Sequence, residues 1–212
     1  MSVAADRYRA HVATVWAAGP NDGAHDLGHL DRVWKNAQAI GLDEGPVDWP
    51  VLGAAVWFHD LVNLPKNSPD RARASTLSAQ AAMAFLAADG FPADKLPAVA
   101  HAIEAHSFSA GIPPTTPEAR ILQDADRLEA LGAIGLARMF LISGQMGGGM
   151  VDMADPMALH RPLDDKAFAL DHLQVKLLRL PETMQTRAGR LMAEERAEWM
   201  MSFRTRLLSE IG

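Results

Sequence analysis

Cysteine is missing from this chain of 212 residues, which excludes disulfide bonds and thiolate sites. Any metal site must therefore use nitrogen and oxygen ligands. An excess of basic residues is missing too, because the formal net charge is −6. Proteins that bind polymeric nucleic acid usually show a basic surface, so we do not expect this activity. A local basic pocket for a phosphorylated small molecule is still compatible with this charge.

Long apolar runs are also missing. No run approaches the roughly 20 apolar residues that a membrane-spanning helix needs. The N-terminal segment, residues 1–7, lacks the basic and then apolar layout of a signal peptide. We therefore expect a cytoplasmic protein without membrane partners.

The chain lacks convincing strand patterns, internal repeats and linkers between domains. Apolar residues instead recur at helical spacing, as in Leu30, Val33, Ala37 and Ile40. This predicts an all-α fold, a single domain over residues 1–212 with roughly eight to ten helices. The helices are expected at residues 6–18, 25–40, 50–60, 70–88, 92–106, 117–128, 132–142, 164–180 and 182–208. Gly41 should end the second helix, and Pro181 should separate the last two.

An unusual pair ends the third predicted helix. The segment from Val51 is apolar and free of internal proline, so it suits a buried helix, yet it runs into His59 and Asp60. Burying ionisable groups without a partner costs several kcal/mol. A divalent cation is the natural compensation.

Two further residues, His29 and Asp126, each lie inside another predicted helix among apolar neighbours. Adjacent helical residues point about 100° apart, so His59 and Asp60 can straddle one ion while other helices add ligands. Imidazole and carboxylate ligands suit one divalent ion such as Mn, Co, Ni, Fe, Zn or Mg. Each residue alone has a structural alternative, such as a packed histidine or an ion pair of Asp126 with a neighbouring arginine. Their combination on three helices favours the metal site.

These residues resemble the motif of the HD superfamily of metal-dependent phosphohydrolases: a histidine, then a His-Asp pair, then a later aspartate. The flanking segments agree, with residues 29–33 resembling the first helix of the family and residues 124–132 its last metal motif. The segments 103–109, 161–166 and 176–181 resemble a subgroup of small single-domain bacterial HD proteins. Together these segments span roughly residues 24–190.

The resemblance implies an all-α bundle with a central metal, in which the motifs fall within residues 25–131 and helices at 164–210 complete the bundle. By position, it implies the metal ligands His29, His59, Asp60 and Asp126. It also implies attack of a metal-activated water on a phosphate ester or anhydride of a small substrate, with a nucleotide as the leading class. Cleavage of a nucleoside triphosphate to monophosphate and pyrophosphate, and nucleotide dephosphorylation, are both known among similar proteins.

The proton acceptor and the phosphate contacts are less specific. Asp60 or Glu104 could take the proton of the water. Some HD nucleotidases have an acid three residues after the His-Asp pair, where this chain has Asn63. Positive charge and hydrogen bonds for the phosphate are predicted from Arg32, Lys176, His106 and Lys66, although a solvated role is an alternative for the bases.

Other interpretations stay open. Asp26, which follows His25, is predicted to cap a helix rather than bind metal. A di-iron oxygenase of the HD type would need two metals, and a regulatory HD protein would bind metal or nucleotide without turnover. A homodimer is one alternative for the oligomeric state: residues such as Trp199, Met200 and Met201 suit a core or a dimer surface, and we expect a core.

Overall fold

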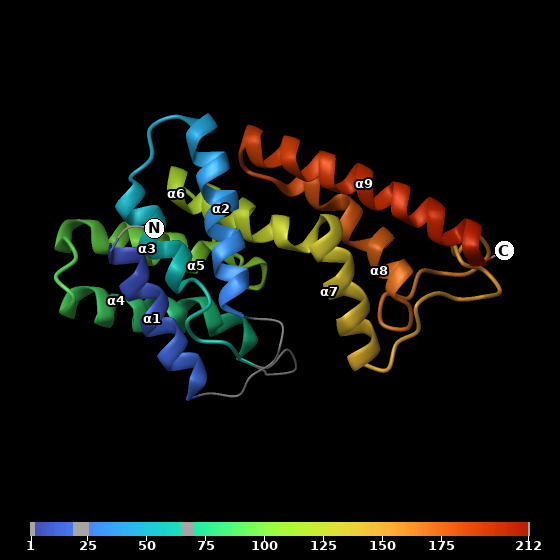
Figure 1. Cartoon of the computed structure of the whole chain (residues 1–212), viewed down its shortest axis with the longest axis horizontal. Coiled ribbons are helices and arrows are strands. Elements are labelled where there is room, and N and C mark those ends of the chain that lie inside the picture. Colours follow the sequence, from blue (N-terminus) through green and yellow to red (C-terminus); the bar gives the residue numbers. More distant parts are fainter. Residues whose placement is uncertain (1–2, 19–25, 65–69, 212) are drawn as a thin grey trace. The chain divides into compact units, whose positions relative to one another are not determined.

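The computed structural model describes residues 3–18, 26–64 and 70–211 (Figure 1). Within these ranges it contains nine α-helices, short 3₁₀ segments and no strand, which confirms the predicted all-α class. The α-helices are α1 (Val3–Ala17), α2 (Leu27–Glu44), α3 (Trp49–Phe58), α4 (Ala74–Ala88), α5 (Leu96–His106), α6 (Pro117–Arg127), α7 (Gly132–Gln145), α8 (Ala169–Val175) and α9 (Arg187–Ile211). An isolated β-bridge joins Gly149 and Phe168.

The chain forms two compact units, Met1–Asp126 and Arg127–Gly212. The first unit contains α1 to α5 and nearly all of α6. The second contains α7 to α9 and the longest 3₁₀ segment, Leu177–Thr183. A single domain over residues 1–212, completed by residues 164–210, stays a prediction.

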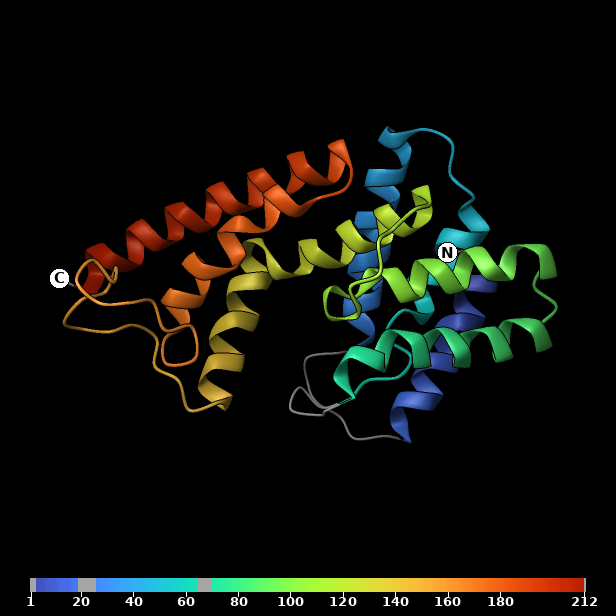
Figure 2. The same cartoon turned by 180° about the vertical axis from the view of Figure 1, so that it is seen from behind.

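Helix α3 is the centre of the first unit and packs against α1, α2, α4 and α5. Its side chains are apolar around nearly the whole circumference, which is the pattern of a fully buried helix. Leu52, Val56 and Phe58 are completely buried. Helices α4 and α5 run side by side, joined by a short connection (Figures 1 and 2). The core of this unit therefore surrounds the helix that ends at the His-Asp pair.

Three side chains cap the helices that position the site. Asp26 accepts a hydrogen bond from the backbone N–H of His29 at 2.7 Å, and Asp48 accepts one from Val51 at 3.2 Å. Thr116 accepts one from the N–H of Ala119 at 3.2 Å, at the start of α6. Aspartate and threonine suit this position because their short side chains satisfy backbone donors that the first turn leaves unpaired. The predicted starts of the third and sixth helices agree with the structure to within one residue, and the cap at Asp26 is confirmed. The second helix begins at Leu27, two residues after its predicted start.

Gly41 does not end α2, which continues to Glu44. A Cβ atom at Gly41 would lie 2.9 Å from a ring atom of Trp49. The glycine therefore serves close packing of the indole against α2. The prediction of a stop signal at this position was wrong because glycine marks close approach as well as helix ends.

The helix expected over 164–180 is only partly formed. Only Ala169–Val175 is α-helical, and Pro181 lies inside the 3₁₀ segment instead of between two α-helices. The carboxylate of Asp164 accepts hydrogen bonds from the N–H groups of Lys166 and Ala167, which satisfies this turn without a helix. Local side-chain hydrogen bonding therefore replaced the predicted first turns.

In the second unit, the 3₁₀ segment and α7 both pack against α9. Met200 is fully buried, whereas Trp199 and Met201 are 48% and 42% exposed. The expectation of a core position is confirmed for Met200 and is wrong for its two neighbours, because successive helical residues point in different directions. None of the described helices has the length and apolar character needed to cross a lipid bilayer.

Candidate metal centre

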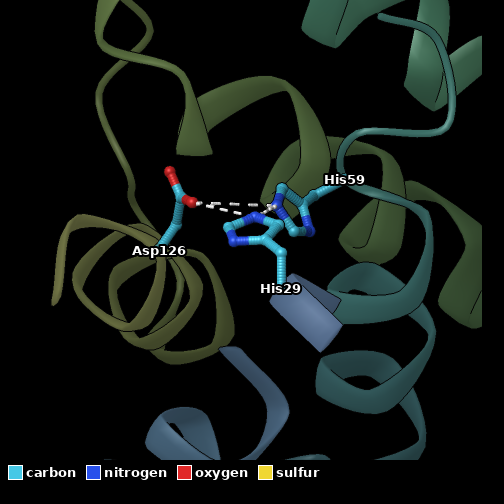
Figure 3. Close-up of side chains that lie close together, drawn as sticks. All are labelled: His29, His59 and Asp126. Carbon is cyan, nitrogen blue, oxygen red and sulfur yellow. Dashed lines mark hydrogen bonds and ion pairs between the residues drawn. The ribbon is translucent and has the colours of Figure 1, made fainter. Parts of the chain in front are cut away.

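Three helices deliver the central side chains. His29 lies in the first turn of α2, and His59 directly follows the last residue of α3. Asp126 lies in the last turn of α6. Figure 3 shows these three side chains pointing toward one another from separate elements. The structure thus brings together residues that are up to 97 positions apart in the chain.

The turn after α3 orients His59. The backbone of His59 is still helical, with φ −59° and ψ −35°, and its Nδ1 lies 2.7 Å from the carbonyl oxygen of Val56. Because a carbonyl can only accept, Nδ1 carries the proton of this hydrogen bond. The Nε2 atom of the neutral ring therefore presents its lone pair to the centre, as in metal-binding histidines held by an outer partner.

The four predicted metal ligands form one cluster in the first unit. His29 Nε2 lies 3.3 Å from His59 Nε2, 3.5 Å from Asp126 Oδ1 and 3.8 Å from Asp60 Oδ2. His59 Nε2 lies 3.5 Å from Asp60 Oδ2 and 3.8 Å from Asp126 Oδ1. Two ligands about 2.1 Å from one ion are separated by roughly 3.0–3.4 Å at octahedral or tetrahedral angles. The donor types and their spacing therefore fit a divalent metal after small adjustments.

The electrostatics of the cluster also suit a cation. Burial lowers the pKa of His59 to about 4, against the opposing effect of the nearby Asp60 carboxylate. The ring is therefore neutral near pH 7 and able to bind metal. The side chains of His29 and His59 are 2% and 0% exposed, whereas those of Asp60 and Asp126 are 21% and 30% exposed. The carboxylates are therefore the part of the cluster that is open to solvent.

His106 joins this cluster from the end of α5. Its Nδ1 donates to the carbonyl of Ile103 at 2.6 Å, and its Nε2 lies 3.6 Å from Asp60 Oδ1. Its ring packs edge-on to His59, with ring centroids 4.8 Å apart. Burial opposes protonation, but Asp60 and Asp126 favour it more, and the net result is a raised pKa of His106. Asp60 thus directs one oxygen to His29 and His59 and the other to His106.

The other two polar residues predicted on α5 are not seen in this cluster. Glu104 lies two positions before His106, so it leaves the helix about 200° around the axis, on the opposite side. This spacing argues against Glu104 taking a proton beside Asp60. His101 accepts a hydrogen bond from the N–H of Thr115 at 3.0 Å and anchors the loop before α6. His101 therefore serves this loop and is not seen in the cluster.

The predicted phosphate-binding residues have different surroundings. Arg32 is half-buried one turn after His29, and its Nη1 lies 3.2 Å from where a Cβ of Gly28 would be. The absence of a side chain at Gly28 therefore leaves room for the guanidinium. Lys176 is exposed at the end of α8 in the second unit. Lys66 lies outside the described residues. The roles of Arg32, Lys176 and Lys66 in binding phosphate stay predictions.

Two supporting residues were not found from the sequence. Trp16 of α1 donates its indole N–H to the backbone carbonyl of Asp60 at 3.3 Å. Asn36 of α2 is buried and donates to the carbonyl of Ala125, next to Asp126, at 3.2 Å. In the sequence, the sign of a supporting role was that Asn36 lies within the apolar stripe of α2. A polar residue on a buried face usually bonds a specific partner.

Comparisons with known proteins agree with this geometry. The model of the HD domain family matches residues 26–131, a range that contains all five clustered side chains. YpgQ of Bacillus subtilis (strain 168), which is described as uncharacterized, is 33% identical over 191 residues. The alignment covers 88% of this chain and 84% of YpgQ.

Solved structures share the fold over nearly the whole chain. The crystal structure of Bacillus subtilis YpgQ in complex with ADP has a TM-score of 0.74 and 32% identity, covering 98% of this chain and 97% of YpgQ. An HD-superfamily hydrolase from Bacillus thuringiensis has a TM-score of 0.76 and 26% identity, covering 97% and 95%. These similarities extend the resemblance beyond the metal motifs.

Proposed function

This chain belongs to the HD-domain family, and on that premise we propose that it is a metal-dependent phosphohydrolase acting on a small phosphorylated substrate, with a nucleotide as the substrate class. The observation that carries the proposal is that the two imidazole Nε2 atoms lie 3.3 Å apart, and each lies 3.5–3.8 Å from the carboxylates of Asp60 and Asp126. The structure of YpgQ with ADP supports a nucleotide as the class of ligand.

His29, His59, Asp60 and Asp126 would hold the ion. A divalent ion at this position supplies Lewis-acid activation of water and neutralises charge on phosphoryl oxygens. The two carboxylates are partly exposed, so a phosphate can approach the ion from their side of the cluster. Arg32, one turn beyond His29, is the proposed positive group for that phosphate.

Proton transfer is proposed for Asp60 and His106. Asp60 Oδ2 faces the two other histidines, and Asp60 Oδ1 faces His106 Nε2 at 3.6 Å. A proton taken up at Oδ1 can therefore be shared with His106, whose Nδ1 is already held by Ile103. This pair is a better candidate for the acid and base work than Glu104, which leaves α5 on the other side.

The geometry supports one ion per site rather than two. His59 and its neighbours form two overlapping groups, one with His29 and Asp126 and one with Asp60 and His106. Both groups need His59, which has only Nε2 to offer because Nδ1 is bonded to Val56. A hydrolase therefore fits these residues better than a di-iron oxygenase.

The test is hydrolysis of a panel of nucleoside mono-, di- and triphosphates with Mn²⁺ or Co²⁺, assaying phosphate and pyrophosphate separately. We expect turnover that requires added metal and falls by at least 100-fold in Asp60→Ala and Asp126→Ala. Asp94→Ala removes an exposed carboxylate in the 3₁₀ turn that precedes α5 and should keep full activity.

The product distinguishes a pyrophosphohydrolase from a phosphatase. Nucleotide binding by the wild type without any turnover would replace this proposal with a regulatory role. Two equivalents of metal per chain by elemental analysis would contradict the assignment of one ion.

A further inference from the structure

Gln123 links the two helices that carry Asp126 and His106. It lies on α6 three positions before Asp126, so the two side chains leave the helix only about 60° apart. Its amide Nε2 donates a hydrogen bond of 2.7 Å to the backbone carbonyl of Ala105, the residue directly before His106 on α5. One buried side chain thus joins the helix of a proposed metal ligand to the helix of the proposed proton-transfer partner.

The carbonyl of Ala105 is available for this bond because it lies in the last turn of α5. The last four carbonyls of a helix have no partner within that helix. Two residues earlier, the carbonyl of Ile103 accepts from Nδ1 of His106 at 2.6 Å. The end of α5 is therefore fixed twice, once by its own histidine and once by α6.

The surroundings of α5 make the bond from Gln123 important. Helix α5 packs mainly against α3 and α4, on which its position depends. Toward α6, His101 bonds the backbone of Thr115 ahead of that helix, at a distance of 3.0 Å. At the end of α5 that carries His106, the link to α6 is the hydrogen bond of Gln123. This bond can therefore set how far His106 lies from the turn of Asp126.

Helix α6 is held by other bonds as well. Asn36 donates to the carbonyl of Ala125, next to Asp126, at 3.2 Å. Glu118, in the first turn of α6, accepts from the backbone N–H of Asp48 at 2.9 Å. Loss of the bond from Gln123 should therefore release the end of α5 and leave α6 in place.

Stability alone does not explain a glutamine at this position. Gln123 is 4% exposed, and its Oε1 is buried without a hydrogen-bond partner among the residues that the structure describes. An unpaired buried acceptor costs free energy, which offsets the gain from the bond to Ala105. Holding the end of α5 accounts for the residue, because only the nitrogen end of the amide is needed for that purpose.

We propose that Gln123 is a positioning residue, which keeps His106 beside Asp60 by fixing the end of α5 to α6. His106 Nε2 lies 3.6 Å from Asp60 Oδ1, and a shift of the end of α5 would change this distance. The four proposed metal ligands lie outside α5 and should stay in place. The effect on turnover rests on the proposed hydrolysis, whereas the effect on His106 is open to measurement in the metal-free protein.

The structural test uses Gln123→Met, which has a similar length and volume but no donor. The ring signals of isotope-labelled histidines are recorded by NMR in the metal-free protein at one pH. The signals of His106 and His29 are identified by their loss in His106→Gln and His29→Gln. In Gln123→Met, the signal of His106 should move or broaden, and that of His29, on α2, should stay in place.

The kinetic test measures nucleotide turnover with Mn²⁺. In Gln123→Met, kcat should fall about 10-fold, the lower end of the range for residues that support a metal site. KM and the dissociation constant of Mn²⁺ should change by less than about threefold, because the metal ligands and the ground-state contacts stay. The double variant with His106→Gln should be no slower than His106→Gln alone, since a residue that acts through His106 has no effect once that ring is removed.

Glu118→Met is the matched control. Glu118 is also buried on α6, and its bond to Asp48 lies at the other end of that helix. This variant should lower the urea midpoint at least as much as Gln123→Met, yet leave the His106 signal and kcat unchanged. A general loss of stability would not produce that difference.

The proposal is overturned if the His106 signal of Gln123→Met stays in place, or if the losses in the double variant add. If the wild type hydrolyses no nucleotide, the proposed hydrolysis fails, and the histidine signals alone decide whether Gln123 positions His106. Circular dichroism checks folding. Gln123→Leu, which also lacks the donor, carries the same measurements if Gln123→Met does not fold.

Discussion

His59 and His106 share a local geometry but face different partners. In each, Nδ1 donates to the carbonyl three residues earlier, at 2.7 Å for His59 and 2.6 Å for His106. The Nε2 atom of His59 then faces His29 and Asp126. The Nε2 atom of His106 instead faces Asp60 Oδ1. The same backbone hydrogen bond thus orients one proposed metal ligand and one proposed proton-transfer partner.

This difference predicts graded effects of substitution. His59→Ala removes a proposed ligand and should abolish tight Mn²⁺ binding. His106→Gln should weaken metal affinity or turnover by about 10- to 100-fold, the range found for outer-shell partners of metal ligands. Isothermal titration calorimetry and turnover assays measure the two effects. Equal losses in both variants would contradict the distinction, and His101→Gln is the control because His101 bonds the loop at Thr115.

At the scale of elements, the first turn of α2 couples helix stability to the site. Asp26 caps this turn through the N–H of His29, and Gly28 leaves room for Arg32 beside it. Two successive turns therefore hold a cap, a proposed metal ligand and a proposed phosphate contact. Disturbing the cap should affect both folding and metal binding.

Asp26→Ala should lower the free energy of unfolding by about 0.5–2 kcal/mol, the usual cost of losing a helix cap. Asp26→Ser retains a capping oxygen and should recover most of this loss. Urea unfolding monitored by circular dichroism measures both. An unchanged midpoint in Asp26→Ala would show that the cap contributes nothing to the stability of α2.

A buried ion pair between the loop before α8 and α8 itself predicts an acid-sensitive loss of stability. Arg161 donates both terminal nitrogens to Asp171, whose side chain is fully buried. These hydrogen bonds hold the pKa of Asp171 below its usual range, against the effect of burial. A lowered folded-state pKa gives stability that is present above the unfolded-chain value, about 4, and is lost as the pH falls below it.

Asp171→Asn removes this titration. The variant should be less stable than the wild type at pH 7, but it should lose less stability between pH 5 and pH 3. Chemical unfolding at each pH measures the slopes. Asp165→Asn alters an exposed carboxylate of the same loop and should keep the wild-type slope. A variant with an unchanged slope would show that Asp171 does not contribute to acid unfolding.

For the whole molecule, metal binding should raise stability by mass action. An ion at 100 times its dissociation constant stabilises the folded state by about 2.7 kcal/mol. For a chain of this size, that free energy corresponds to a rise in Tm of roughly 5–10 °C. Differential scanning calorimetry with Mn²⁺ and with a chelator measures the shift. Asp126→Ala should show no shift and Asp94→Ala the full one; a shift retained in Asp126→Ala would place the ion elsewhere.

Much of the architecture could be predicted from local sequence patterns. The apolar run of α3, its cap at Asp48 and the cap of α6 at Thr116 act over a few residues, so the predicted starts agreed with the structure. Prediction failed where side-chain contacts decided the outcome. Gly41 was interpreted as an end, but it makes room for Trp49. The helix expected over 164–180 lost its first turns to hydrogen bonds of Asp164, and only Ala169–Val175 is α-helical.

The sequence by itself determined the all-α class, the membership in the HD family and the four candidate metal ligands, because these depend on residue type and order along the chain. Only the tertiary structure decided which side chains support the site. It placed His106 beside Asp60 and brought Asn36 to the residue before Asp126. It also brought Gln123 to the carbonyl of the residue before His106. These arrangements depend on how separate helices pack, and no spacing along one helix specifies that.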